Sequence, residues 1–162
     1  MKRTGNTKIK PIRQRDSSAC GPTSIKMVAN YFHVPISWDR IGKVSDYRRR
    51  DGLHNRDLVR TLEKLGFRVR SSINTTWSRL KRNNVTGKVI VVSWMLKGYI
   101  GHFSIVDRIT DKAVYLADPE SGKIIRIDRI IFMRLWLDYD PKWYPVRNTD
   151  INLRWMAVIS KR

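Results

Sequence analysis

The stretch from residue 88 to residue 128 most constrains the fold, because short apolar segments alternate there with turn sequences. Its first segment has few charges and many β-branched residues, which is typical of a buried strand. The turn sequences TDK and PESG separate the later segments. Such short turns join strands that run in opposite directions, so the sequence predicts an antiparallel sheet. The predicted strands are KVIVVSWML, GHFSIVDRI, KAVYLADP and GKIIRID.

The part of the chain before this sheet has helical periodicity. Apolar residues recur at helical spacing after Gly21-Pro22, and NRDLVRTLEKLGF has leucines along one face. SWDRIGKV, TTWSRLKRNN and, after the sheet, RIIFMRLW are shorter predicted helices, and RWMAVISKR is a possible closing strand. Helices followed by antiparallel strands predict an α+β fold. The expected N-terminal caps are Ser37, Asn55, Thr75 or Thr76, and Asp128.

Composition limits the classes of protein that the chain can belong to. A length of 162 residues suits one domain, and 41% hydrophobic with 29% charged residues is typical of a globular protein. The longest apolar run, VIVVSWML, is too short to span a bilayer, and no signal peptide is recognisable. A single cysteine cannot form an intrachain disulfide. We therefore expect a cytoplasmic protein in a reducing compartment.

The net charge of +19, from 33 Lys and Arg against 14 Asp and Glu, favours encounter with acidic partners. Nucleic acid, anionic lipid and acidic peptides all belong to this class. Because the basic residues are spread along the chain, the charge by itself selects none of them.

The single cysteine, Cys20, lies in QRDSSACGPTSIKMVANYF, directly before the first predicted helix. Pro22 suits the first turn of that helix, and Gly21 is expected to leave room for a substrate backbone. Free N–H groups and partial positive charge at a helix N-terminus stabilise a thiolate. Cys20 is therefore a candidate nucleophile. The alternative is a small buried apolar residue, which is the usual role of a free cysteine.

A cysteine nucleophile needs a base, and the histidines of the chain are His33, His54 and His102. His33 follows the first helix at its C-terminal end, where a structural role is expected, and His54 lies in a loop before another helix. His102 stands at the start of the predicted strand GHFSIV, on rigid backbone. His102 is thus the candidate base, and the alternative is a structural core histidine.

Asp118 is the candidate for the group that orients His102. It ends the strand after the one that His102 begins, and antiparallel pairing brings these two ends together. Asp107 is a competitor, but it lies five residues beyond His102 on the same strand, so its side chain is expected on the opposite face. The alternative for Asp118 is an ordinary turn aspartate before Pro119.

Acyl transfer also requires hydrogen-bond donors for an oxyanion. The backbone N–H of Cys20 is one candidate, and the side chain of Gln14 is a second if the loop between them turns back. A carboxamide donates a hydrogen bond without adding charge. The alternative for Gln14 is a plain surface glutamine.

At these residues the chain resembles the papain-like cysteine peptidases, and more closely the bacteriocin-processing leader peptidases. The resemblance rests on Q-x5-CGP-x-S-I-x-M, RDGLHNRDLVRTLEKLGF, GHFSIV and LADPESGKI, and it extends over about residues 12–135. It implies a papain-like α+β fold with N-terminal helices packed on a C-terminal antiparallel sheet. It also implies Cys20 as nucleophile, His102 as base, Asp118 as orienting acid and Gln14 as oxyanion donor, with no metal and no cofactor.

Members of that family cleave leader peptides after a double glycine, so the resemblance implies a peptide substrate. The chain departs from the family in having Ala19 before the cysteine, where an acidic residue is frequent, with Asp16 nearby. Residues 1–162 are expected to form one peptidase-like domain. Within it, residues 1–11 form a flexible basic arm, 12–135 the family-like core and 136–162 an extension that packs on the core or lengthens a cleft.

The same triad could also hydrolyse other amides or perform transpeptidation, and the sequence does not choose between these reactions. Two other functions remain open from the sequence. One is a peptide-binding relative without activity, although such relatives typically lack the cysteine. The other is a basic nucleic-acid-binding domain, suggested by the charge together with 6 Trp and 6 Tyr. A steep salt dependence of binding to random DNA or RNA would favour the second alternative.

Overall fold

The computed structural model describes residues 8–47, 52–139 and 144–162. Helices dominate the first half of the chain and antiparallel strands the second, so the α+β prediction is confirmed. None of the helices in these ranges is long and apolar enough to cross a membrane. The elements are α1 (Cys20–Tyr31), α2 (Trp38–Ser45), α3 (Asn55–Lys64), β1 (Phe67–Ser72), α4 (Trp77–Asn83), β2 (Val89–Leu96), β3 (Ile100–Ile109), β4 (Ala113–Asp118), β5 (Lys123–Asp128), α5 (Arg129–Leu135), β6 (Leu137–Tyr139), a 3-10 helix (Asn148–Asp150), β7 (Ile151–Leu153) and β8 (Met156–Lys161).

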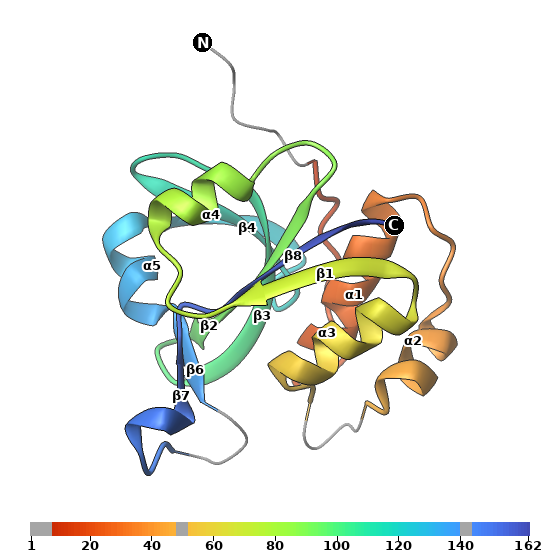
Figure 1. Cartoon of the computed structure of the whole chain (residues 1–162), viewed down its shortest axis with the longest axis horizontal. Helices are drawn as coiled ribbons and strands as arrows, with labels where there is room; N and C mark the ends of the chain where they lie inside the picture. Colours follow the sequence, from red (N-terminus) through yellow and green to blue (C-terminus); the bar gives the residue numbers. More distant parts are fainter. Residues whose placement is uncertain (1–7, 48–51, 140–143) are drawn as a thin grey trace.

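The main sheet has the strand order β1-β8-β2-β3-β4-β5, and each neighbouring pair is antiparallel. Strands β2 to β5 follow one another through the turns that the sequence predicts. Strand β8, the last element of the chain, lies inside the sheet between β1 and β2 (Figure 1). The C-terminal segment therefore completes the hydrogen bonding of the sheet, in addition to the small β6–β7 pair.

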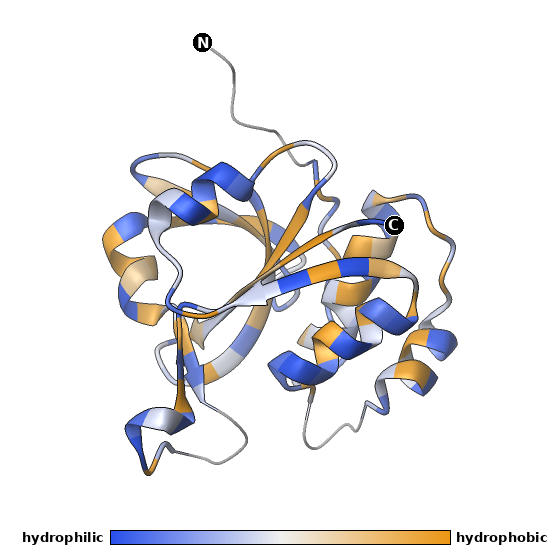
Figure 2. Ribbon diagram, viewed as in Figure 1, coloured by the Kyte–Doolittle hydropathy of each residue, from blue (hydrophilic) through white to orange (hydrophobic). Residues whose placement is uncertain are grey.

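Helices cover both faces of the sheet, and strand β2 separates the two cores. Val89 and Val91 pack with residues of α1, α2 and α3, whereas Ile90 and Val92 pack with residues of α4 and α5. This alternation follows from the period of two along a strand. Figure 1 shows α1 to α3 grouped together and α4 with α5 on the other side, and Figure 2 shows the largely hydrophobic central strands between them.

Two of the four predicted helix N-caps are confirmed by side-chain hydrogen bonds in the structure. The side chains of Ser37 and Thr76 accept hydrogen bonds from the N–H groups of Arg40 and Arg79, both at 3.1 Å, as expected of N-caps. The other two caps are corrected as follows. His54 holds the N-cap position of α3, while the Asn55 side chain instead donates to Asp138 at 2.9 Å. Asp128 precedes α5 without a side-chain cap, and its carboxylate pairs with Arg126.

The described part of the N-terminal arm packs on the domain. Ile9 is buried in the core beside α1, and its N–H donates to the Asp107 carboxylate at 3.1 Å. Within this segment Ile9 contacts the core, whereas Lys8 and Lys10 are exposed. Residues 1–7, and residues 48–51 of the basic cluster YRRRDG, lie outside the described ranges.

Gly21 is buried in the first turn of α1, and a Cβ at this position would lie 2.9 Å from Leu53 Cβ. The room that the sequence assigned to substrate is thus occupied by Leu53. We expect Gly21→Ala to lower the free energy of unfolding by about 1–3 kcal/mol, because the added methyl overpacks this contact. Gly42→Ala in α2 is the matched control, since a Cβ added at Gly42 would have no atom within 4 Å.

Chemical denaturation of both variants measures the effect. The control should be stabilised by roughly 0.5–1 kcal/mol through the higher helix propensity of alanine. An equal gain in stability for Gly21→Ala would show that the Leu53 contact does not restrict this position.

Candidate active site

The antiparallel pairing of β3 with β4 places His102 beside Asp118. Ile105 lies opposite Ala117, so the start of β3 faces the end of β4. The His102 ring nitrogen Nε2 and Asp118 Oδ1 are 2.6 Å apart, and both side chains are buried. The structure therefore brings together the two residues whose neighbourhood the strand order predicted.

The turn after β4 orients the Asp118 carboxylate. Oδ1 also accepts the backbone N–H of Glu120 at 3.2 Å, and Oδ2 accepts that of Ser121 at 3.0 Å. Burial raises the pKa of Asp118, but the hydrogen bond and charge of His102 and the bonds from Ser121 outweigh it, so its pKa is lowered overall. Asp118 is thus held as a carboxylate with both oxygens engaged.

His102 is only 4% exposed and packs against Trp94, its partner across the strands. The two ring centroids are 5.7 Å apart at 77°, and Trp94 Nε1 donates to Ser104 Oγ at 3.0 Å. Trp94 was not identified from the sequence, although its place opposite the candidate base on a buried strand was a usable signal. The tryptophan limits the orientations open to the imidazole.

Asp118 and Cys20 both favour the protonated form of His102. Burial lowers its pKa, but hydrogen bonds to Asp118 and Cys20 and the negative charges of both residues outweigh this effect and raise the pKa to about 9. Because Asp118 takes Nε2, Nδ1 is the ring nitrogen left for Cys20. A protonated His102 therefore lies between the Asp118 carboxylate and Cys20.

Cys20 is the first residue of α1, and 9% of its surface is exposed. Ala19 occupies the N-cap position and makes no side-chain cap, and the first turn contains no acidic residue. The helix N-terminus therefore directs unneutralised N–H groups and partial positive charge toward the thiol. Together with the proximity of His102, whose pKa Cys20 raises, this places Cys20 in a setting suited to nucleophilic chemistry.

Gln14 reaches the same region, and it contacts the turn after Asp118. Its backbone N–H donates to the Pro119 carbonyl at 2.7 Å, and its side-chain Nε2 donates to Glu120 Oε2 at 3.1 Å. The Oε1 atom is buried and has no hydrogen-bond partner in the described part of the chain. The carboxamide is thus bonded to Glu120 and not to Cys20.

The loop from Gln14 to Cys20 is held by a cluster that the sequence did not indicate. Asp16 Oδ1 accepts from the N–H and hydroxyl of Ser18, both at 3.0 Å, and from the Tyr47 hydroxyl at 2.8 Å. Burial raises the pKa of Tyr47; the Ser18 bond opposes this, while Asp16 and the charge of Cys20 add to it. The Tyr47 hydroxyl therefore remains a donor that anchors the loop before the cysteine.

The other titratable candidates lie apart from this arrangement. Asp107 is engaged with the Ile9 N–H, as described above. His33 is exposed after the end of α1 with a φ of 55°, and His54 precedes α3. Among the described residues, no group of three or more His, Cys, Asp or Glu is placed to hold a metal ion.

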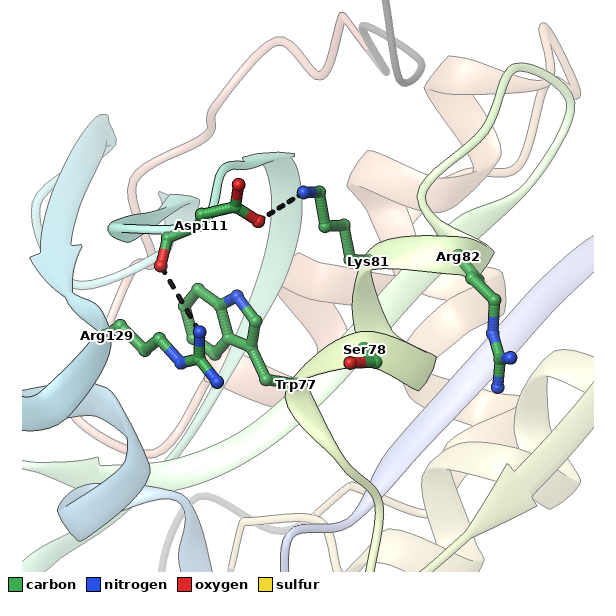
Figure 3. A pocket seen from close by; sticks show the side chains of 6 residues that line it. All are labelled: Trp77, Ser78, Lys81, Arg82, Asp111 and Arg129. Carbon is green, nitrogen blue, oxygen red and sulfur yellow. Dashed lines mark hydrogen bonds and ion pairs between the residues drawn. The ribbon is translucent and has the colours of Figure 1, made fainter.

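A cavity of about 280 Å³ lies away from Cys20 and is shown in Figure 3. Lys81 pairs with the Asp111 carboxylate, and Arg129 donates to the Asp111 carbonyl at 3.5 Å while lying 5.3 Å from the Trp77 ring. These contacts tie α4, the β3–β4 turn and α5 together. Because Asp111 already engages two of the cations, we assign this corner a structural role.

The raised pKa of His102 predicts a pH dependence of stability. Between about pH 6.5 and 9 the folded state retains on His102 a proton that the unfolded state has lost, so the His102 contribution to the free energy of unfolding falls as pH rises. Where Cys20 pairs with His102 as a thiolate, the folded state lacks the thiol proton that the unfolded state keeps up to about pH 8.5, so the net fall of wild type is confined to the upper end of this range. The His102 contribution is fully present below about pH 6.5, is lost through about pH 9, and amounts to at most roughly 3 kcal/mol. Urea denaturation at pH 6, 7, 8 and 9 measures it.

Two variants isolate the source of this dependence. His102→Gln should flatten the fall between pH 6.5 and 9, whereas Cys20→Ala should shift it to lower pH, because two influences that raise the His102 pKa are removed. A fall of the same size in wild type and His102→Gln would contradict the assignment to His102.

Comparison with known proteins gives one family and several similar folds. A family model described as the peptidase C39 family matches residues 8–139. No curated protein matches the chain. A double glycine motif protease from an AMS/PCAT transporter, solved in complex with the leader peptide, is 17% identical with a TM-score of 0.75, covering 98% of this chain and 95% of that one.

Two further solved structures have the same fold. The peptidase domain of Streptococcus ComA, a bi-functional ABC transporter involved in quorum sensing, is 22% identical with a TM-score of 0.71, and the match covers 95% of this chain and 99% of that one. A putative C39-like peptidase from Bacillus anthracis is 12% identical with a TM-score of 0.73, with coverage of 100% and 99%.

Proposed function

The chain belongs to the peptidase C39 family and is a cysteine-type peptidase, and from this premise we propose that it cleaves peptides through Cys20, His102 and Asp118. The observation that carries the proposal is the buried His102–Asp118 hydrogen bond, together with the influence of Cys20, at the N-terminus of α1, on the pKa of His102. A nucleophile, a base and an orienting acid occur in the order that acyl transfer requires.

In the first half of the reaction, the Cys20 thiolate attacks the carbonyl carbon of the scissile bond. A C–S bond forms, and the carbonyl oxygen takes up negative charge that the Cys20 N–H and the Gln14 carboxamide stabilise. The C–N bond then breaks, and the His102 imidazolium gives its proton to the leaving amine. The products are a free amine and a thioester on Cys20.

In the second half, neutral His102 takes a proton from water as that water attacks the thioester. The second oxyanion collapses, the C–S bond breaks, and the carboxylic acid leaves while Cys20 returns to its thiolate. Asp118 holds the ring and stabilises its cation in both halves without being protonated itself, in keeping with its lowered pKa.

The substrate that we propose is a leader peptide, cleaved after a pair of small residues such as Gly-Gly. Support comes from the family, and from a similar fold that was solved as a double glycine motif protease in complex with the leader peptide.

A cleavage assay tests this function. The full chain is incubated with a pool of internally quenched peptides that carry a central Gly-Gly pair between randomised flanks, and the fragments are identified by mass spectrometry. We expect one cleavage position directly after the second glycine. Cleavage after other residues would overturn the proposed specificity, and no cleavage of any peptide would overturn the proposed use of Gly-Gly peptides.

A further inference from the structure

We propose that Glu120 is a positioning residue that orients the Gln14 carboxamide for the oxyanion, an inference that rests on the proposed peptidase function. Glu120 lies two residues beyond Asp118, in the turn between β4 and β5. Its carboxylate oxygen Oε2 accepts a hydrogen bond from Gln14 Nε2 at 3.1 Å. This is the side-chain hydrogen bond that the structure gives to Gln14.

The chemistry of the two groups decides which end of the amide faces Glu120. A carboxylate is only an acceptor, whereas a carboxamide has an NH2 donor on one side and a carbonyl acceptor on the other. Glu120 therefore selects the NH2 end and disfavours the flipped amide, in which two oxygens would meet. The Nε2 atom carries a second N–H, which this bond leaves available for an oxyanion.

The remaining atoms of Gln14 do not themselves impose an orientation on the carboxamide. Its Oε1 atom is buried without a hydrogen-bond partner in the described part of the chain. A glutamine side chain has several rotatable bonds, and an unpartnered carbonyl gives no reason for one rotamer to persist. The bond to Glu120 supplies the missing directional contact.

The turn that carries Glu120 is itself rigidly placed against the catalytic aspartate and the Gln14 backbone. Glu120 N–H donates to Asp118 Oδ1, and Gln14 N–H donates to the Pro119 carbonyl. Gly122 has a φ of +68°, and a Cβ on it would lie 2.7 Å from Arg13 Cβ, so the two segments are in close contact. One short turn thus orients both the partner of His102 and the proposed oxyanion donor.

Comparison of Glu120→Ala with Glu63→Ala tests the proposal, because Glu63 is an exposed glutamate on α3, apart from the candidate site. With the quenched Gly-Gly peptides, Glu120→Ala should lower kcat by about 10-fold to 10²-fold with KM unchanged, below the roughly 10²-fold to 10³-fold cost of losing an oxyanion donor. Glu63→Ala should match wild type. Glu120→Gln, which keeps an acceptor but permits either amide orientation, should fall between Glu120→Ala and wild type.

Alkylation of Cys20 by iodoacetamide separates positioning of Gln14 from general damage. Displacement of iodide forms no oxyanion, so the alkylation rate of Glu120→Ala should equal that of wild type. Glu120→Ala should also cost nothing further in a Gln14→Ala background, because it acts through Gln14.

Three results would overturn the inference. Glu120→Ala could have the kcat of wild type, or a higher kcat because the carboxylate repels the oxyanion. Alternatively, Glu120→Ala could lower kcat equally in the wild-type and Gln14→Ala backgrounds. Each requires an active wild type and so leaves the proposed function intact. Absence of turnover in wild type is the distinct outcome in which the proposed function fails and takes this inference with it.

Discussion

Cys20→Ala is expected to abolish peptide cleavage, with a loss of at least about 10³-fold in kcat, because removal of a nucleophile leaves only the contribution of binding and oxyanion stabilisation. The fold should be preserved, since alanine is smaller and fits the same helical position without strain. Cys20→Ser keeps a nucleophilic oxygen but not a readily ionised one, so it should be inactive as well.

The measurement is the initial rate of cleavage of the quenched peptides, with thermal denaturation as a check of folding. Ser24→Ala is a matched control, because Ser24 lies one turn further along the same helix and is fully buried. Full activity in folded Cys20→Ala would refute the proposed mechanism outright. Loss of activity in Ser24→Ala to the same extent would point to the helix and not to the thiol.

Removal of His102 is the second large effect. In wild type we expect rapid alkylation of Cys20 by a thiol-reactive peptide electrophile below pH 7, because an imidazolium with a pKa of about 9 pairs with the thiolate. In His102→Gln the rate should fall by roughly 10²-fold at pH 6, since this ion pair is lost. Peptide turnover should fall further, because no group remains to protonate the leaving amine.

His33→Gln is the control for this experiment, because His33 is exposed after the end of α1 and should leave labelling unchanged. Labelling of wild-type Cys20 no faster than that of free cysteine would return the residue to a packing role. Equal rates in wild type and His102→Gln would instead show that the helix N-terminus activates the thiol without the imidazole.

The environment of Asp118 makes its replacement by asparagine informative within the same assay. An asparagine oxygen can still accept from His102 and Glu120, but its NH2 group would then face the Ser121 N–H that Oδ2 accepts. Two donors would meet there, and the charge that raises the pKa of His102 would be lost. We therefore expect a loss smaller than that of His102→Gln but accompanied by a lower labelling rate at pH 6.

Local patterns in the chain predicted most elements of the fold. The helical spacing after Gly21-Pro22, the buried run at 89–96 and the turns TDK and PESG are each readable within a few residues. Antiparallel pairing across one turn then placed His102 near Asp118, because the geometry of a hairpin depends mainly on its own residues. The residues in these contacts lie near one another in the chain, which is why the sequence could predict them.

Contacts between segments that are distant in the chain could not be predicted from such local patterns. Strand β8 lies between β1 and β2, although β2 ends at Leu96 and β8 begins only at Met156. The cover of the second sheet face by α4 and α5 likewise depends on the packing of Trp77 and Phe132 against β2. A sequence pattern states that a face is apolar, but it does not state which helix will cover that face.

The sequence by itself determined the class of the fold, the place of Cys20 at a helix start and the neighbourhood of His102 and Asp118, because each follows from local periodicity or from one hairpin. Only the tertiary structure decided that Leu53 fills the space beside Gly21 and that Asp16 and Tyr47 anchor the loop before Cys20. It also decided that the Gln14 carboxamide meets Glu120, 106 residues away. A hydrogen bond between such distant residues depends on how whole segments pack, and no spacing in the chain encodes that packing.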